Sequence, residues 1–178
     1  MTNQYPIMKK ILSPLISFFV FLTFFLHSTI VTGQEITTYY LIRHAEKDLS
    51  DKSNRNPHLT EVGQERALAW KKYFKEVDFD AVYSTNYHRT KETATPTAED
   101  HNLPIEAYDP RDLYNTDFKT ATLGKTVLIV GHSNTTPFLA NKILGKETFT
   151  SIDERIHGNL YLLQLYGDHV SCQLLSLE

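Results

Sequence analysis

Cysteine is almost missing from this sequence of 178 residues, in which Cys172 is the only one. A single cysteine can neither form a disulfide within the chain nor supply a cysteine-rich metal site. Cys172 lies in the alternating run 170–174, where a place in the core of a strand is the simplest interpretation. The histidines also lack metal-ligand spacing such as His-Glu-x-x-His. We therefore expect no metal and no cofactor.

Positive charge is not in excess, since 18 Lys and Arg residues face 21 Asp and Glu residues and give a net charge of −3. Proteins that bind nucleic acid carry a basic footprint, so the sequence predicts no nucleic-acid partner. It has no internal repeat and no low-complexity tract. Nothing in it indicates an obligate protein partner.

Only one long hydrophobic run is present, at residues 11–26. Two lysines precede it and a polar, small-residue stretch, 27–33, follows it, which is the order typical of a secretory signal peptide. We expect a signal peptide at 1–33, with Met8 as an alternative start and cleavage before Gln34. The protein would then be exported, to a periplasmic or extracellular place. The run is shorter than the roughly 20 apolar residues of a spanning helix; a retained leader that anchors the N-terminus in the membrane is the alternative.

Removal of the leader leaves 178 − 33 = 145 residues, 34–178, enough for one domain with one core. Apolar runs and helical periodicity alternate along them, which predicts an α/β fold with a mixed sheet covered by helices on both faces. Pro96 should break or kink its helix, and 109–124 is expected to be a variable loop. We expect strands at 37–43, 81–84, 105–108, 126–130, 160–166 and 169–175, and helices at 60–77, 89–100 and 134–144.

Two of the predicted strands end in a histidine. Arg43 and His44 follow the first strand, and Gly131 and His132 follow the strand at 126–130. Ligands bind in the crevice outside the carboxyl ends of such strands, so the two histidines are expected in one pocket. An arginine fork suits phosphate oxygens. A cation beside His44 disfavours protonation of the imidazole, and a neutral imidazole can attack phosphorus.

These residues belong to four motifs that resemble the histidine phosphatase, or phosphoglycerate mutase-like, superfamily, in its small Arg-His-Ala branch. The resemblance runs from about residue 38 to the C-terminus. The motifs occur in the family's order: Arg43-His44-Ala45; Leu59-Thr60-x-x-Gly63; Ser84-x-x-x-x-Arg89-x-x-x-Thr93-Ala94; and Gly131-His132-Ser133-Asn134.

The resemblance implies a three-layer αβα fold with a six-stranded, mostly parallel sheet and one antiparallel strand. It implies that His44 becomes phosphorylated and is then attacked by water. Arg43, Arg89 and His132 would bind the phosphoryl group, with Asn134 as a further substrate-binding residue.

This chain differs from many members of the family at the position of the general acid. Many members carry a glutamate where this chain has Asn115, and an amide cannot give up a proton. Asp112 or Asp117 would have to replace it, unless the leaving group needs no acid; a solvated loop position is the simpler interpretation of each.

We expect an exported, metal-independent phosphohydrolase that acts through a phosphohistidine on a phosphate monoester or a related small phosphorylated substrate. The alternatives are a mutase-type phosphoryl transferase and a non-catalytic protein that binds a phosphorylated ligand. Only 42 residues separate Arg89 from His132. That leaves little chain for the lid that a mutase needs to exclude water, which favours hydrolysis.

Overall fold

The computed structural model describes residues 35–112 and 114–177. The predicted signal peptide at 1–33, with its alternative start at Met8, lies outside the described residues. Within them, every helix is too short or too polar to cross a membrane.

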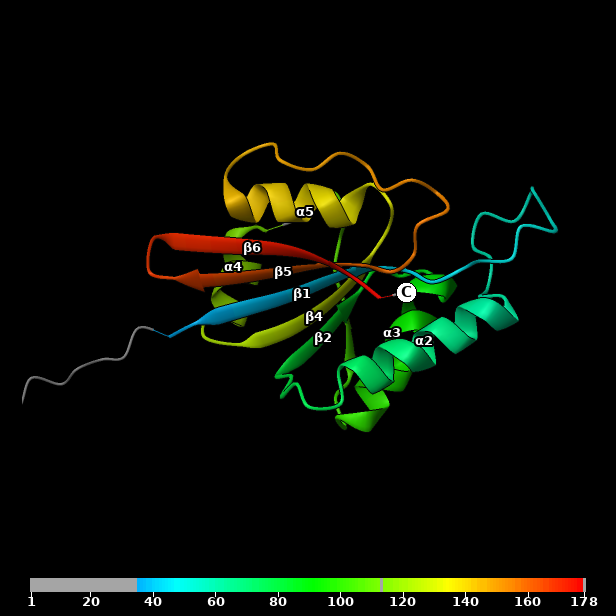
Figure 1. Ribbon diagram of the computed structural model, residues 1–178, viewed down its shortest axis with the longest axis horizontal. Coiled ribbons are helices and arrows are strands. Elements are labelled where there is room, and N and C mark those ends of the chain that lie inside the picture. The colour runs from blue at the N-terminus through cyan, green and yellow to red at the C-terminus, as the bar shows by residue number, and fades with distance from the viewer. Residues whose placement is uncertain (1–34, 113, 178) are drawn as a thin grey trace, which may run out of the picture. The chain divides into compact units, whose positions relative to one another are not determined.

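A six-stranded sheet forms the centre of the described chain, with the strand order β3-β2-β4-β1-β5-β6 (Figure 1). Strands β1 to β4 run parallel to one another, β5 runs antiparallel to β1, and β6 runs antiparallel to β5. Only β5 is therefore reversed, as predicted. The strands are β1 (Thr37–Arg43), β2 (Ala81–Ser84), β3 (Ile105–Ala107), β4 (Thr126–Gly131), β5 (Asn159–Tyr166) and β6 (His169–Ser176).

Helices cover both faces of the sheet, because the central strands are apolar on both sides. Helices α2 (Glu61–Tyr73) and α3 (His88–Asp100) lie on one face, where Trp70 of α2 packs with strand residues such as Leu128. Helices α4 (Thr116–Thr122) and α5 (Thr135–Leu144) cover the other face, where Leu139 of α5 and Phe118 of α4 pack with Ile129. The three-layer αβα class is confirmed.

Two local predictions needed correction. Helix α2 ends at Tyr73 rather than at residue 77, and it buries Gly63, Ala67 and Trp70 while Val62 is exposed. The segment 109–124 is not all loop, because it contains α4, whose first turn is capped by Asn115: the side-chain oxygen accepts a hydrogen bond from the Phe118 N–H. Pro96 lies inside α3 without ending it.

The register of the sheet brings the two histidine motifs together. Strands β1 and β4 are adjacent and parallel, and Arg43 pairs with Gly131. The His44 N–H donates to the Gly131 carbonyl over 2.9 Å, so the chain after β1 stays joined to the end of β4. A Cβ at Gly131 would lie 2.7 Å from Thr136 Oγ1, which explains why glycine is needed where α5 closes over the sheet.

Candidate active site

His44 is almost completely buried, with 2% of its surface exposed. Its Nδ1 lies 2.7 Å from the Ala45 carbonyl oxygen. A carbonyl can only accept a hydrogen bond, so Nδ1 carries the proton and Nε2 keeps its lone pair. Burial, followed by the positive charges of Arg89 and Arg43, lowers the pKa of His44 to about 2. The ring is therefore neutral, as expected from its sequence context, although burial contributes more than Arg43 does.

Arg43, at the end of β1, is 1% exposed. Its Nη1 donates to the carbonyl oxygens of Asp153 and Ile156, each over 3.0 Å, and its Nη2 donates to a carboxylate oxygen of Glu154. Its Nε is buried without a hydrogen-bond partner. The loop after α5 thus fixes the guanidinium and leaves its Nε–H without an acceptor.

Arg89 lies in the first turn of α3, where its guanidinium stacks 4.5 Å from the centre of the Tyr87 ring. Its Nε and Nη1 are buried without a hydrogen-bond partner. Burial lowers the pKa of Arg89 from its ordinary value. Buried donors in folded proteins almost always find acceptors. Arg89 lines the same cavity as His44, so its unpartnered N–H groups are available to an anion there. Arg43, which precedes His44, is not among the residues that line this cavity.

The ring of His132 lies 5.5 Å from that of His44. Its Nε2 is 2.9 Å from Thr85 Oγ1, and its Nδ1 is 3.4 Å from Arg89 Nη2. Burial and the charge of Arg89 lower the pKa of His132 to about 4, so the ring is neutral at pH 7. A hydroxyl can donate or accept. The guanidinium of Arg89 can only donate, so Nδ1 of His132 accepts from it and the ring proton sits on Nε2, which donates to Thr85 Oγ1. Thr85 Oγ1 in turn donates to Thr90 Oγ1 over 3.0 Å. His132 therefore orients Arg89 at the cavity.

His44, Arg89 and His132 line one cavity of about 700 Å³, together with Ser133 and Asn134. This volume lies within the range of small-molecule sites. Aromatic and proline side chains at the wall, including Tyr87 and Phe138, and the cations Lys47 and Arg111 extend the cavity beyond the histidines. The side-chain oxygen of Asn134 also caps α5 by accepting from the Thr135 N–H over 2.9 Å.

Two residues of this site were not predicted as site residues. Glu154 lines the cavity, accepts from Arg43, and accepts from Ser133 Oγ over 2.7 Å. The Ser133 hydrogen bond is the main cause that lowers its pKa, so it is a carboxylate at neutral pH. His157 donates through Nδ1 to the carbonyl oxygen of His44 over 3.0 Å. Both come from the loop between α5 and β5, where the sequence shows no motif.

The structure does not bring Asp112 or Asp117 to His44. Both line a second cavity of about 320 Å³ with apolar neighbours such as Phe118. Asp112 accepts a hydrogen bond from Asn115 Nδ2 over 3.0 Å. Neither carboxyl lines the cavity that holds His44, so neither is placed to protonate a leaving group there.

Residues of the second and third motifs contact the backbone that follows His44. The Ala45 N–H donates to Thr93 Oγ1 over 2.9 Å, which ties the residue after His44 to α3. A Cβ at Gly63 would lie 2.2 Å from the Glu46 carbonyl oxygen, so glycine lets α2 approach the backbone there. These contacts give the motif residues a physical reason beyond the resemblance.

The family model of the histidine phosphatase superfamily (branch 1) matches residues 39–111. This segment contains the first three motifs and ends before Gly131. Over this segment the chain is similar to the histidine phosphatase superfamily, the family that its motifs resemble. The predicted enzyme class, a phosphatase of the histidine phosphatase type, is confirmed at the level of the family. No curated protein sequence matches the chain.

Several solved structures share the fold. The protein histidine phosphatase SixA complexed with tungstate is 16% identical, with a TM-score of 0.62 over 78% of this chain and 96% of that one. Phosphoglycerate mutase from Bacillus anthracis is 14% identical, with a TM-score of 0.62 over 81% and 94%. A mycobacterial glucosyl-3-phosphoglycerate phosphatase is 12% identical, with a TM-score of 0.56 over 79% and 98%. At these identities the likeness concerns the fold alone.

Proposed function

We propose that this protein hydrolyses a small phosphorylated substrate through a phosphohistidine formed at Nε2 of His44. The observation that carries the proposal is a neutral, buried imidazole whose free Nε2 shares a cavity with arginine N–H groups that have no partner. A bound phosphoryl group would supply the acceptors that these donors lack.

In the first step the Nε2 lone pair attacks phosphorus, the N–P bond forms, and the bond from phosphorus to the leaving oxygen breaks. Negative charge in such a transition state spreads over three equatorial oxygens. Arg43 Nε, Arg89 Nε and Arg89 Nη1 would donate to these oxygens, and His132 would hold Arg89 in place by accepting from its Nη2 at Nδ1. The Ala45 carbonyl stabilises the Nδ1–H while the phosphorylated ring carries positive charge.

In the second step a water attacks phosphorus, the N–P bond breaks, and the electron pair returns to Nε2. The water proton leaves with phosphate or passes to solvent, so His44 ends as the neutral imidazole that began the cycle. The same donors bind the equatorial oxygens in both steps. None of these roles requires a metal ion.

The carboxyl groups at the site favour substrates whose leaving group is weakly basic. Glu154 is the carboxylate beside Arg43, and its lowered pKa leaves it without a proton to give at neutral pH. A leaving group must then depart with its own charge, which suits aryl phosphates and phosphorylated imidazoles. The fold is shared with a protein histidine phosphatase, which is a related precedent for the second type of substrate.

Hydrolysis is favoured over mutase-type transfer by the chain between Arg89 and His132. Its described residues form the rest of α3, the strands β3 and β4, a seven-residue α4, and the short loops that join them, one of which contributes Pro110 and Arg111 to the wall of the cavity. No further helix is left in that described segment to close over the cavity and exclude water. A phosphorylated His44 would therefore be accessible to water.

We also propose that the protein is exported, on the strength of the lysine, apolar and small-residue order of residues 9–33. The test is the N-terminal sequence of the protein recovered from the periplasm or medium of a bacterial host. A start at Gln34 is expected. Full-length chain found only in the cytoplasm would refute export, and full-length chain in the membrane fraction would support the anchored alternative.

The catalytic proposal is tested with the purified 34–178 chain, p-nitrophenyl phosphate, and EDTA in every assay. We expect turnover that resists EDTA and is inhibited by vanadate, which mimics five-coordinate phosphorus. Phosphate-ligand binding without turnover would support the non-catalytic alternative. Conversion of a phosphoglycerate into its isomer, without release of phosphate, would support the mutase.

A further inference from the structure

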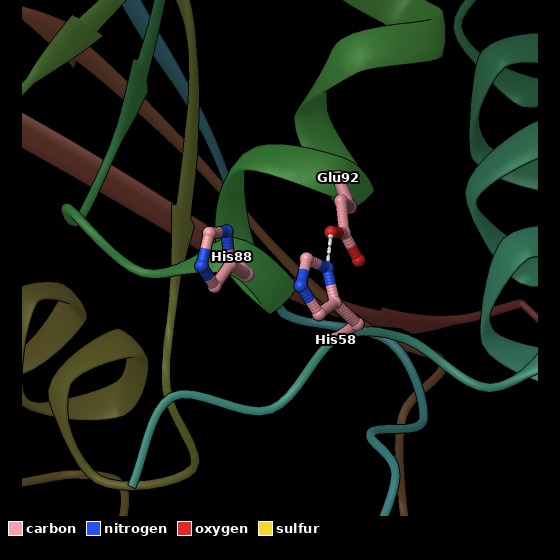
Figure 2. Close-up of side chains that lie close together, drawn as sticks. All are labelled: His58, His88 and Glu92. Atoms are coloured by element: carbon pink, nitrogen blue, oxygen red, sulfur yellow. Dashed lines mark hydrogen bonds and ion pairs between the residues drawn. The ribbon is translucent and has the colours of Figure 1, made fainter. Parts of the chain in front are cut away.

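We propose that His58, His88 and Glu92 form a binding site for a zinc-class divalent ion, separate from the phosphatase cavity. His58 precedes the Leu59-Thr60 motif, and His88 and Glu92 lie one turn apart on α3. One ligand atom from each side chain lies within 4.8 Å of the others. Figure 2 shows the three side chains facing one another between the loop and the helix.

The positions of the three residues are set by hydrogen bonds that already join the loop to the helix. One carboxylate oxygen of Glu92 accepts from the Leu59 N–H over 2.8 Å, and the other is hydrogen-bonded to Nδ1 of His58. The backbone N–H of His88 donates to Asn56 Oδ1 over 2.8 Å. The Leu59 bond orients Glu92 from outside the site, as outer hydrogen bonds do for metal ligands, whereas the bond between His58 and Glu92 joins two proposed ligands and would be replaced by the ion.

The donor set fits zinc chemistry. Two imidazoles and one carboxylate are a known Zn²⁺ ligand combination, with water in the fourth position, and imidazole also suits Cu²⁺ and Ni²⁺. Tetrahedral zinc with bonds near 2.0–2.2 Å places its ligand atoms about 3.3 Å apart. The three atoms must therefore approach by rotation of their side chains. His58 is 64% exposed, so its ring can turn and the site is open to solvent.

The two imidazoles are stacked with ring centres 4.2 Å apart and planes 20° from parallel. Protonation of both would bring two positive charges face to face, and only one carboxylate is present to balance them. A divalent ion would instead be bound by both neutral rings and by the carboxylate of Glu92. A simple ion pair between His58 and Glu92 is the alternative, and it gives His88 no role.

The site would fasten α3 to the loop that precedes α2. Arg89, which lines the cavity, directly follows His88. Thr93, which accepts from the Ala45 N–H, directly follows Glu92. The ion would thus stabilise the helix that carries Arg89 without contacting the substrate. None of the three ligands lines the phosphatase cavity.

The test is a titration of the EDTA-treated, dialysed protein with Zn²⁺, followed by competition with a chromophoric chelator and by thermal melting. We expect one ion per chain with a micromolar or tighter Kd. At zinc concentrations 100-fold above that Kd, the Tm should rise by about 5 °C or more. His58→Gln, His88→Gln and Glu92→Gln should each weaken binding at least 100-fold and remove the Tm rise.

The matched control is His169→Gln, which alters another exposed histidine at the start of β6. It should bind zinc like the wild type. His132→Gln reports on zinc held by the catalytic histidines. The proposal is overturned if the wild type binds no zinc at micromolar concentrations. It is also overturned if binding survives in His58→Gln and His88→Gln but is lost in His132→Gln. Enzyme activity in EDTA is a separate result, because the proposed reaction uses no metal.

Discussion

Replacement of Arg89 by methionine should lower activity and raise stability at the same time. The guanidinium has two buried nitrogens without partners, Nε and Nη1. A buried donor without an acceptor costs about 1–3 kcal/mol, so at least about 2 kcal/mol is recovered when both are removed. Loss of the stacking contact with Tyr87 and of the long 3.4 Å hydrogen bond from Nη2 to His132 Nδ1 together gives back about 1 kcal/mol. The net gain of about 1 kcal/mol corresponds to a Tm rise of about 2–4 °C for a domain of this size.

The same substitution removes donors that would stabilise the transition state. Loss of a single such donor raises the barrier by about 2.7–4 kcal/mol, or about 100- to 1,000-fold in rate. We expect kcat/KM for p-nitrophenyl phosphate to fall by at least this factor and vanadate inhibition to weaken in parallel. Arg55→Met, at an exposed loop position, is the control and should change neither. An Arg89→Met protein that keeps its rate, or that melts well below the wild type, would refute the reasoning.

Three further predictions concern the same cavity. His132→Ala should lose about 100- to 1,000-fold in rate, and Thr85→Val, which cannot orient that ring, should lower kcat and shift its pH profile while folding normally. Aryl phosphates should turn over far faster than alkyl phosphates; equal rates, with selective loss of alkyl turnover in Asp112→Asn or Asp117→Asn, would reveal an acid in that loop. His44 has a folded pKa of about 2, below the ordinary 6.5, so its stabilising contribution is complete above pH 6.5 and is lost as the pH falls. The free energy of unfolding, measured with urea, should fall between pH 6.5 and 4.5 by about 1.4 kcal/mol per pH unit more for the wild type than for His44→Asn. If this free energy depends on pH equally in both proteins, the ring of His44 is protonated in the folded state.

The sequence predicted the strands and the proximity of the two histidine motifs because these signals are local. Arg43 and His132 each follow an apolar run that can only be a buried strand, and Arg89 begins a helix. The carboxyl ends of neighbouring parallel strands must meet at one edge. The number of strands and the one reversed strand came from the family resemblance. The order of the strands came from the structure, since periodicity alone does not say which strands are neighbours.

The remaining parts of the site depend on the path of loops. Glu154 and His157 lie in a segment without periodicity, and only the folded chain shows that they reach Arg43 and His44. Helix α4 was missed because its few residues are mostly polar and its packing rests on Phe118.

The cluster at His58 was missed for another reason. His88 and Glu92 have helical spacing, but their partner lies 30 residues earlier in the chain. Spacing rules find ligands that share one element or one short loop. Here the contact between the loop and α3 creates the set, so only tertiary structure can show it.

The most direct test of the central claim is to trap the phosphoryl group on the enzyme. Wild-type protein is mixed with ³²P-labelled aryl phosphate, quenched within milliseconds, and digested for mass spectrometry under alkaline conditions that preserve phosphohistidine. The account predicts acid-labile, base-stable label on His44 at up to one per chain, and neither label nor turnover in His44→Ala. Full turnover by His44→Ala, or label on another residue, would contradict it.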